Sequence, residues 1–315
     1  MPNNTALERY KGCLLGLACG DAVGTTLEFA PRDSHEPLTD MVGGGPFNLE
    51  AGQWTDDTSM ALCLAASLIE DGSFNPKGQM RRYLSWYRHG YMSSTGTCFD
   101  IGNTTMDALE RFEKTGDPYS GSFDPQTAGN GSLMRLAPVV MRYGNQHTTL
   151  LDFAEKSSAT THAAPEAMEC CQLLAKVIAS ALQGSWKEDL LDGAEDGLTQ
   201  SRVIELARGN WRFKQRDQIR SNGYCVDSLE AAFWCAYNTL TFQDAVLMAA
   251  NLGDDADTTA AIAGQIAGAL WGINGIPPHW REKLHKRELI EDMAEKLYLL
   301  ADGEVPTSHS TASDP

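Results

Sequence analysis

The sequence predicts an all-α protein, and three observations support this fold class. Apolar residues recur at three- and four-residue spacing through most of the 315 residues. Segments of alternating β-branched and polar residues bounded by hairpin turns are nearly absent. Neither a shift in composition nor a solenoid repeat divides the chain, so we expect a single compact multi-helix domain over residues 1–301. The tail 302–315 is rich in Ser, Thr and Pro, and we expect it to be disordered.

The periodic segments give the order of the predicted helices. The first has apolar residues at Cys13, Leu14, Leu17 and Ala18, and the second ends just before Gly72, where a helix stop is typical. The full set spans 6–21, 57–70, 76–89, 103–114, 133–143, 150–160, 165–182, 186–208, 226–237, 242–251, 258–271 and 277–301.

Two of these helices carry a stripe of glycine. Glycine recurs every four residues at positions 12, 16, 20 and 24, and again at positions 264, 268 and 272. Each glycine costs a soluble helix about 1 kcal/mol relative to alanine, so the stripes indicate close backbone packing against a neighbour. We interpret them as structural, although each of these helices borders an acidic cluster.

Charge and cysteine usage restrict the partners. The chain has 25 Lys and Arg against 42 Asp and Glu, a net charge of −17, which disfavours binding to nucleic acid or anionic lipid. No apolar run approaches the roughly 18–20 residues that a membrane helix needs, and the N-terminus does not resemble a signal peptide. The eight cysteines are scattered without a C-x-x-C pair, as in a cytoplasmic protein with reduced thiols. We expect a monomer, because no amphipathic helix is left without a core to face.

Two acidic clusters stand directly before predicted helices. W-T-D-D-T-S covers 54–59, and G-D-D-A-D-T-T covers 253–259. One such start is routine, since Asp and Thr cap helix N-termini, but two suggest a shared purpose. Carboxylates and hydroxyls are the ligands that Mg²⁺ and Mn²⁺ prefer. An EF-hand does not fit, because Ala260 and Ile266 stand where its Gly and Glu belong.

Convergence of these clusters has an electrostatic consequence. The four residues concerned are Asp56, Asp57, Asp255 and Asp257. If their carboxylates come to about 5 Å from one another, each pair repels by about 3 kcal/mol at an effective dielectric near 20. Either the clusters remain two separate helix caps, or cations lie between them.

Other chemical signals are weaker. The chain has no Walker loop, dinucleotide fingerprint, nucleophile elbow or H-E-x-x-H motif. A histidine placed like His162 is more often a helix-end residue than a ligand. The loops at 99–105 and 128–132 run small residues into helix starts, which is typical of a phosphate-holding loop or of an ordinary turn.

Taken together, seven motifs resemble the ADP-ribosylglycohydrolase family. In chain order they are G-D-A-V-G-x-x-x-E-F (20–29), W-T-D-D-T (54–58), F-D-I-G-N-T-T (99–105), A-G-N-G-S-L-M-R (128–135), T-H (161–162), N-G-Y-x-V-D-S (222–228) and G-D-D-A-D-T-T (253–259). The resemblance covers roughly residues 6–300. Within the family, the chain looks most like the bacterial branch that includes the dinitrogen-reductase-activating glycohydrolase.

The resemblance implies two divalent cations, Mn²⁺ or Mg²⁺, in a cleft at helix N-termini that also holds ADP-ribose. The residues that match the family's metal ligands are Thr55, Asp56, Asp57, Asp255, Asp257 and Thr258. Glu28 and Asp100 match its catalytic carboxylates. The positions that match substrate contacts are Gly102, Asn103, Asn130, Gly131, Ser132, His162 and Tyr224. One departure is visible, because Asp254 replaces the second glycine of the family's G-G-D-A-D-T motif.

The implied activity is metal-dependent removal of ADP-ribose from a modified protein side chain, releasing free ADP-ribose. An N-glycosidic bond to arginine is the first choice, with Asp100 or Glu28 moving the proton that the leaving group needs. Serine-linked or small-metabolite ADP-ribosyl substrates are the alternatives. A non-catalytic ADP-ribose binder or immunity protein would have lost metal ligands, whereas all four Asp residues of the paired clusters are present. A phosphohydrolase would instead cut the pyrophosphate and release AMP.

Overall fold

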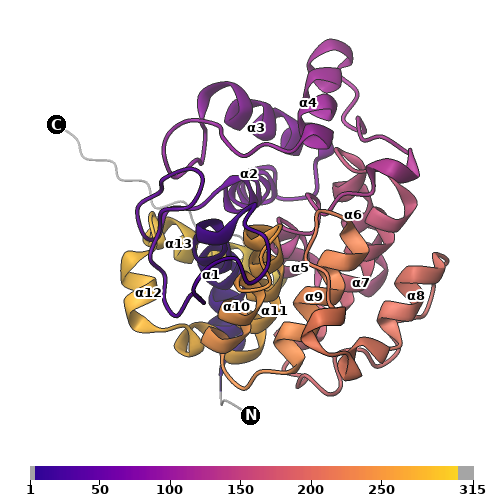
Figure 1. Cartoon of the computed structure of the whole chain (residues 1–315). Helices are drawn as coiled ribbons and strands as arrows, with labels where there is room; N and C mark the ends of the chain where they lie inside the picture. Colours follow the sequence, from indigo (N-terminus) through magenta and orange to yellow (C-terminus); the bar gives the residue numbers. More distant parts are fainter. Residues whose placement is uncertain (1–3, 304–315) are drawn as a thin grey trace.

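Helices account for nearly all regular structure in the computed structural model, which describes residues 4–303 (Figure 1). The α-helices are α1 (Ala6–Gly24), α2 (Asp56–Asp71), α3 (Pro76–His89), α4 (Asn103–Thr115), α5 (Ala137–Tyr143), α6 (His147–Ala159), α7 (Pro165–Leu182), α8 (Ser201–Ala207), α9 (Cys225–Tyr237), α10 (Phe242–Ala250), α11 (Ala256–Gly275), α12 (Pro278–Lys283) and α13 (Arg287–Ala301). Short 3-10 turns span Thr25–Leu27, Pro125–Thr127, Asn210–Phe213 and Arg216–Gln218. Between residues 4 and 303 only isolated β-bridges occur, so the predicted all-α class is confirmed.

The glycine stripes of α1 and α11 pack directly on each other at the centre of the molecule (Figure 1). A Cβ atom added at Gly16 would lie 2.3 Å from the carbonyl oxygen of Gly264, and one at Gly12 would lie 2.3 Å from that of Gly268. Gly20 faces the Ala260 carbonyl in the same way, at 2.1 Å. The predicted close backbone packing is therefore confirmed, and the partner of each stripe is the other stripe's helix.

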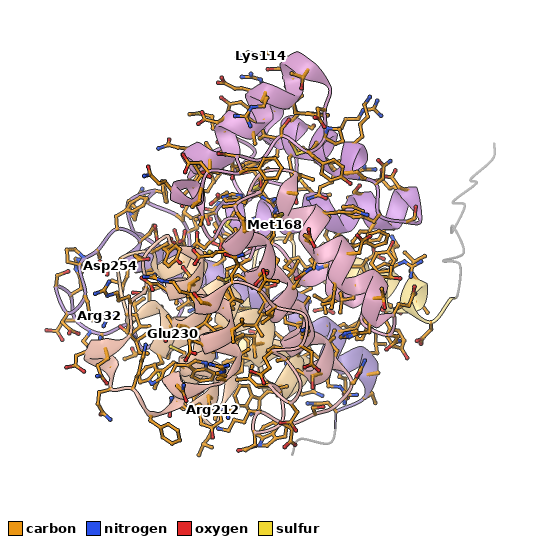
Figure 2. All side chains as sticks on the ribbon, turned by 90° about the vertical axis from the view of Figure 1, so that its right-hand side faces the viewer. Arg32, Lys114, Met168, Arg212, Glu230 and Asp254 are labelled. Carbon is orange, nitrogen blue, oxygen red and sulfur yellow. The ribbon has the colours of Figure 1, made fainter. Side chains whose placement is uncertain are left out.

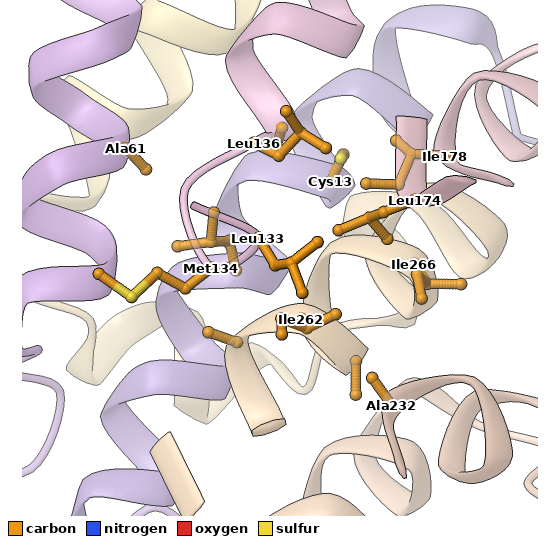
Figure 3. Close-up of a cluster of buried hydrophobic side chains, with 14 of the residues drawn as sticks. Cys13, Ala61, Leu133, Met134, Leu136, Leu174, Ile178, Ala232, Ile262 and Ile266 are labelled. Carbon is orange, nitrogen blue, oxygen red and sulfur yellow. The ribbon is translucent and has the colours of Figure 1, made fainter. Parts of the chain in front are cut away.

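The remaining helices surround this pair. Figure 1 shows α3 and α4 at the top of the view, α7, α8 and α9 on the right, and α12 and α13 on the left. The segment before α5 threads through the core. In Figure 3 its Leu133 and Leu136 lie in one cluster with Cys13 of α1, Ile262 of α11 and Leu174 of α7, all of them buried.

Most predicted helices are present, and two match at both ends, α3 and α7. The start of α2 includes Asp56, and its C-cap Gly72 adopts a left-handed φ of 70°, as the stop signal predicted.

Three predicted extents are wrong. The helix predicted over 186–208 is reduced to α8, because Gly193 and Gly197 adopt positive φ and break the preceding segment into turns. The helix predicted over 277–301 is divided into α12 and α13. At the break, Lys286 has φ of 47°, and the His285 amide donates to the Gly52 carbonyl oxygen at 3.0 Å instead of continuing the helix. The segment 133–135 forms turns and Leu136 is the N-cap, so α5 begins only at Ala137.

No helix within residues 4–303 is long and apolar enough to cross a membrane. Each of the eight cysteines is a free thiol, and all but Cys98 are buried. Most of the tail predicted to be disordered, residues 304–315, lies outside the described part of the chain, so that prediction and the domain boundary at 301 stay predictions.

The glycine contact gives a stability prediction. We expect Gly16→Ala to lower the free energy of unfolding by about 2–4 kcal/mol, because the new methyl group meets backbone atoms that cannot rotate away. Urea denaturation measures this change. The matched control is Gly102→Ala, where φ is −67° and no atom lies within 4 Å of the new Cβ. The control should change by less than about 1 kcal/mol, and equal effects of the two variants would contradict the packing argument.

Candidate active site

The N-termini of α2, α4 and α11 meet around one cavity of about 750 Å³. Asp56 begins α2, Asn103 begins α4 and Asp255 is the N-cap of α11. All three line the cavity, together with Glu28 from the segment after α1. The helix starts explain why acidic side chains gather here, since free amides and the positive end of the helix dipole favour carboxylates.

One group of carboxylates lies at the floor of the cavity. Asp21, Asp57 and Asp257 offer oxygen atoms within 4.8 Å of one another. The Thr55 hydroxyl oxygen lies 2.9 Å from Asp21 Oδ1 and 3.2 Å from an oxygen of each of the other two. A hydroxyl carries one hydrogen, so it can satisfy only one of these three carboxylates. Asp57 Oδ1 is buried without a hydrogen-bond partner among the described residues, which suits a cation ligand.

A second group shares Asp257 with the first. Its other members are Glu28 and Asp255, again with oxygen atoms within 4.8 Å. Glu28 Oε2 accepts hydrogen bonds from the amides of Ala256 at 2.8 Å and Asp257 at 3.2 Å, which fix its side chain at the start of α11. Asn130 Nδ2 donates to Asp255 Oδ2 at 2.9 Å. Two all-oxygen groups joined by one aspartate form an arrangement that fits two neighbouring hard cations.

Burial and mutual repulsion raise the pKa values of these carboxyl groups. Burial is the larger cause, and the charge of Asp257 is the next, in raising the pKa of Asp21 and of Asp255 to about 7 and that of Glu28 to about 12. Burial followed by the charge of Asp56 raises the pKa of Asp100 to about 11. Asp56 and Asp57 also have pKa values well above the ordinary range, for the same two reasons as Asp21. Divalent cations would offset this repulsion, so the residues present fit such ions.

The sequence reasoning missed Asp21. Its side chain is fully buried and accepts hydrogen bonds from the amides and hydroxyls of Thr55 and Thr58, at 2.6–2.9 Å. It thereby ties α1 to the start of α2 while facing Asp57 and Asp257. The available signal was a lone aspartate beside Gly20, inside an otherwise apolar, glycine-striped helix.

Three non-glycine residues at the cavity adopt left-handed backbone conformations. Phe29 and Asp100 have φ of 60°, and Asp254 has φ of 58°. The Phe29 amide donates to the Asp254 carbonyl oxygen at 2.8 Å, and the Asp254 amide donates to that of Ala30 at 2.8 Å. Asp254 is exposed and lies beside Arg32 at one edge of the molecule (Figure 2). Aspartate tolerates this conformation better than most side chains, which explains how it replaces glycine here.

Most of the predicted substrate contacts also line the cavity, namely Gly102, Asn103, Asn130, Gly131 and His162. Four predicted site residues do not line it. Thr55 and Asp57 are fully buried beneath the lining residue Asp257, and the Ser132 hydroxyl faces Ser158 and Cys171. The Tyr224 hydroxyl donates to Glu166 at 2.5 Å.

We expect the cation-free protein to lose stability as pH rises. Between pH 3.8, the ordinary pKa of aspartate, and about 7, the folded state holds protons on Asp21 and Asp255 that the unfolded chain has released. Raising the pH through this window therefore favours unfolding. Calorimetry in the presence of a chelator should show Tm falling over it. Because a divalent cation replaces those protons, Mn²⁺ should raise Tm more at about pH 8 than at about pH 5.

The control for this experiment is Asp189→Asn, which removes an exposed carboxylate far along the chain from these clusters. It should leave the pH profile and the Mn²⁺ effect unchanged, while Asp255→Asn should flatten both. A Tm that does not respond to divalent cations at about pH 8 would contradict the cation site.

A second prediction concerns Asp254. We expect Asp254→Ala to be about 1 kcal/mol less stable than Asp254→Gly, because alanine is strained at a φ of 58° and glycine is not. Urea denaturation of the two variants measures the difference. Equal stabilities would mean that the left-handed conformation does not decide which residues this position accepts.

Comparisons with known proteins identify the family of this chain. The ADP-ribosylglycohydrolase profile matches residues 2–306. ADP-ribosylarginine hydrolase Tri1 of Pseudomonas putida (strain GB-1) is 52% identical over 295 residues, covering 93% of this chain and 78% of that protein. ADP-ribosyl-[dinitrogen reductase] glycohydrolase of Rhodospirillum rubrum is 30% identical, covering 88% of this chain and 90% of that one. A solved structure described as an ADP-ribosylglycohydrolase-related protein complex superposes with a TM-score of 0.84 at 41% identity, over 94% of this chain and 99% of the other. The chain belongs to the ADP-ribosylglycohydrolase family.

Proposed function

We propose that this protein hydrolyses the N-glycosidic bond between ADP-ribose and an arginine side chain, releasing free ADP-ribose. The observation that carries the proposal is the pair of carboxylate groups sharing Asp257 at the floor of a cavity large enough for a nucleotide. The arginine linkage is supported by the 52% identical relative, whose name describes an ADP-ribosylarginine hydrolase.

The cation ligands that we propose are Thr55, Asp56, Asp57, Asp255, Asp257 and Thr258. Asp21 supports them from behind, because its two oxygens already accept four hydrogen bonds from Thr55 and Thr58. All of the proposed ligands except Asp255 are buried, and they supply only oxygen donors, which suits Mg²⁺ or Mn²⁺ better than softer metals. When bound, such cations supply a Lewis acid to oxygen atoms at the reacting end of the substrate.

Hydrogen bonds fix the side chain of Glu28, whereas Asp100 lines the cavity from a loop, and this difference suggests different roles. Glu28 Oε2 is committed to two amides at the start of α11, so we propose that it mainly orients this end of the site. Asp100 lines the cavity from a loop before α4, and burial and the charge of Asp56 raise its pKa. We propose that Asp100 holds the proton that passes to the guanidine nitrogen as the bond to the anomeric carbon breaks.

The helix start at α4 and the loop before α5 form the other part of the cavity. Gly102 and Asn103 present amides at the N-terminus of α4, and Asn130 and Gly131 line the same cavity. The Asn130 side-chain N–H groups already donate to Ser228 and Asp255, which fixes its orientation beside the carboxylates. Uncharged donors of this kind suit the phosphates and ribose of ADP-ribose. We propose that these residues, with His162, bind that part of the substrate.

The free thiols and the net charge support proposals for the location of the protein and for the class of its substrate. We propose a cytoplasmic location, supported by eight free thiols that an oxidising compartment would not preserve. The net charge of −17 supports a modified protein rather than modified nucleic acid as the substrate. A monomer remains our expectation.

The decisive experiment measures release of ADP-ribose from an arginine-ADP-ribosylated protein in the presence of Mn²⁺. We expect release by the wild-type protein, loss with a chelator, and loss in Asp255→Ala. Asp100→Asn should lower kcat by about 10²–10⁴-fold with little change in KM, because the amide cannot supply the proton. Asp189→Asn is the control and should retain full activity.

Each alternative has its own product. Cleavage of serine-linked or small-metabolite substrates without cleavage of the arginine substrate would reject the arginine linkage and keep the glycohydrolase chemistry. Release of AMP would show that the pyrophosphate is cut instead. Tight binding of ADP-ribose without release from any substrate would identify a non-catalytic binder.

A further inference from the structure

Arg135 is a fully buried arginine that none of the ion pairs within residues 4–303 includes. Its Nη2 donates to Thr161 Oγ1 at 2.6 Å, and its Nη1 contacts Met60 Sδ at 3.7 Å. The guanidinium lies 4.7 Å from the ring centroid of Tyr83. Burying a cation without a carboxylate is costly, so we expect the guanidinium of Arg135 to have a purpose. Its one short hydrogen bond goes to Thr161, and this contact indicates which residues Arg135 orients.

The hydrogen bond from Arg135 to Thr161 determines which ring nitrogen of His162 carries the proton. Thr161 Oγ1 also lies 2.8 Å from His162 Nδ1. Arginine can only donate, so the Thr161 oxygen accepts from it and keeps its own hydrogen for one further bond. Among the described residues, the other hydrogen-bond partner of this buried hydroxyl is His162 Nδ1, which must therefore accept.

The opposite assignment leaves a hydrogen without a partner. If Nδ1 carried the proton and donated to Thr161, the hydroxyl would accept two hydrogen bonds and its own hydrogen would be buried with no described acceptor. A doubly protonated ring is disfavoured as well. Burial, and after it the charge of Arg135, lowers the pKa of His162 to about 3.

The other ring nitrogen faces the cavity. His162 is only 3% exposed, yet it lines the cavity beside Gly129 and Gly131. A Cβ atom at either glycine would lie within 3.3 Å of His162 Nε2, so a larger residue at either position would crowd this nitrogen. An Nε2–H group here would point its hydrogen at whatever oxygen occupies that part of the cavity.

We propose that Arg135 and Thr161 are positioning residues that hold neutral His162 as an Nε2–H donor aimed into the cavity. The acceptor is an oxygen atom of bound ADP-ribose, and only this acceptor rests on the proposed function. The tautomer itself is a property of the free protein and can be measured without substrate.

The first test is the nitrogen spectrum of the free protein labelled with ¹⁵N-histidine. His162→Asn assigns the His162 signals by their disappearance. We expect Nδ1 at the shift of an unprotonated ring nitrogen and Nε2 at that of a protonated one, at neutral pH. A protonated Nδ1 would overturn the proposal, whether or not the protein hydrolyses any substrate.

The second test separates positioning from simple support of the fold. Thr161→Val keeps the shape of the side chain and removes the hydroxyl, so the preference for the Nε2–H tautomer should be lost and ADP-ribose should bind about tenfold more weakly. Thr161→Ser should restore both. The matched control is Thr160→Val, since Thr160 is also fully buried and donates to the Ser157 carbonyl oxygen without touching His162.

We expect Thr160→Val to lower stability but to leave the His162 tautomer unchanged. An unaltered tautomer in folded Thr161→Val would overturn the role of Thr161. ADP-ribose that binds the wild-type protein without shifting the Nε2 signal would overturn the acceptor. Failure of arginine hydrolysis with the expected tautomer present would count against the proposed function alone.

Discussion

The contact between the backbones of α1 and α11 is the constraint on which the rest of the structure depends. Cβ atoms at Gly12, Gly16 and Gly20 would come within 2.1–2.3 Å of carbonyl oxygens on α11, so the two helices touch at a distance that no larger side chain permits. Asp21 follows this glycine row on α1, and Asp257 lies in the first turn of α11. Helices held apart by larger side chains lie 8–10 Å axis to axis, and the carboxylates would then not meet.

The close approach of α1 and α11 brings buried carboxylates together, and their mutual repulsion destabilises the folded protein. Asp257 belongs to both carboxylate groups, and burial together with its charge raises the pKa of Asp21 and of Asp255 to about 7. Protons or divalent cations must therefore accompany folding, which couples the stability of the protein to the ions that it binds. Thr55 and Thr58 hold Asp21 in place through four hydrogen bonds, so neutralisation by ions does not require the carboxylates to move.

The sequence predicts the positions of helices and of acidic helix starts well, but it does not predict which helices pack on each other. Periodicity locates α3 and α7 at both ends, and the acidic starts of α2 and α11 are visible as motifs. The glycine stripes predict close packing, but spacing alone does not say that α1 packs on α11. For the same reason Asp21 is missed, since it lies inside a helix and acquires its neighbours only through that pairing. The broken helices at 186–208 and 277–301 depend on Gly193, Gly197 and a contact with Gly52, which apolar periodicity does not reveal.

The cavity is lined both by carboxylates and by uncharged hydrogen-bond donors, and these two kinds of group interact differently with an anionic ligand. The proposed substrate, ADP-ribose, is anionic, and the carboxylate groups would repel it unless cations were bound to them. The α4 amides and His162, which also line the cavity, are uncharged, and under the proposed function they would bind phosphate oxygens without needing cations. Keeping His162 neutral has a further advantage, because a second positive charge in the same cavity would compete with the ions for the carboxylates. A buried Arg135 that suppresses protonation and orients the ring through Thr161 is consistent with that requirement.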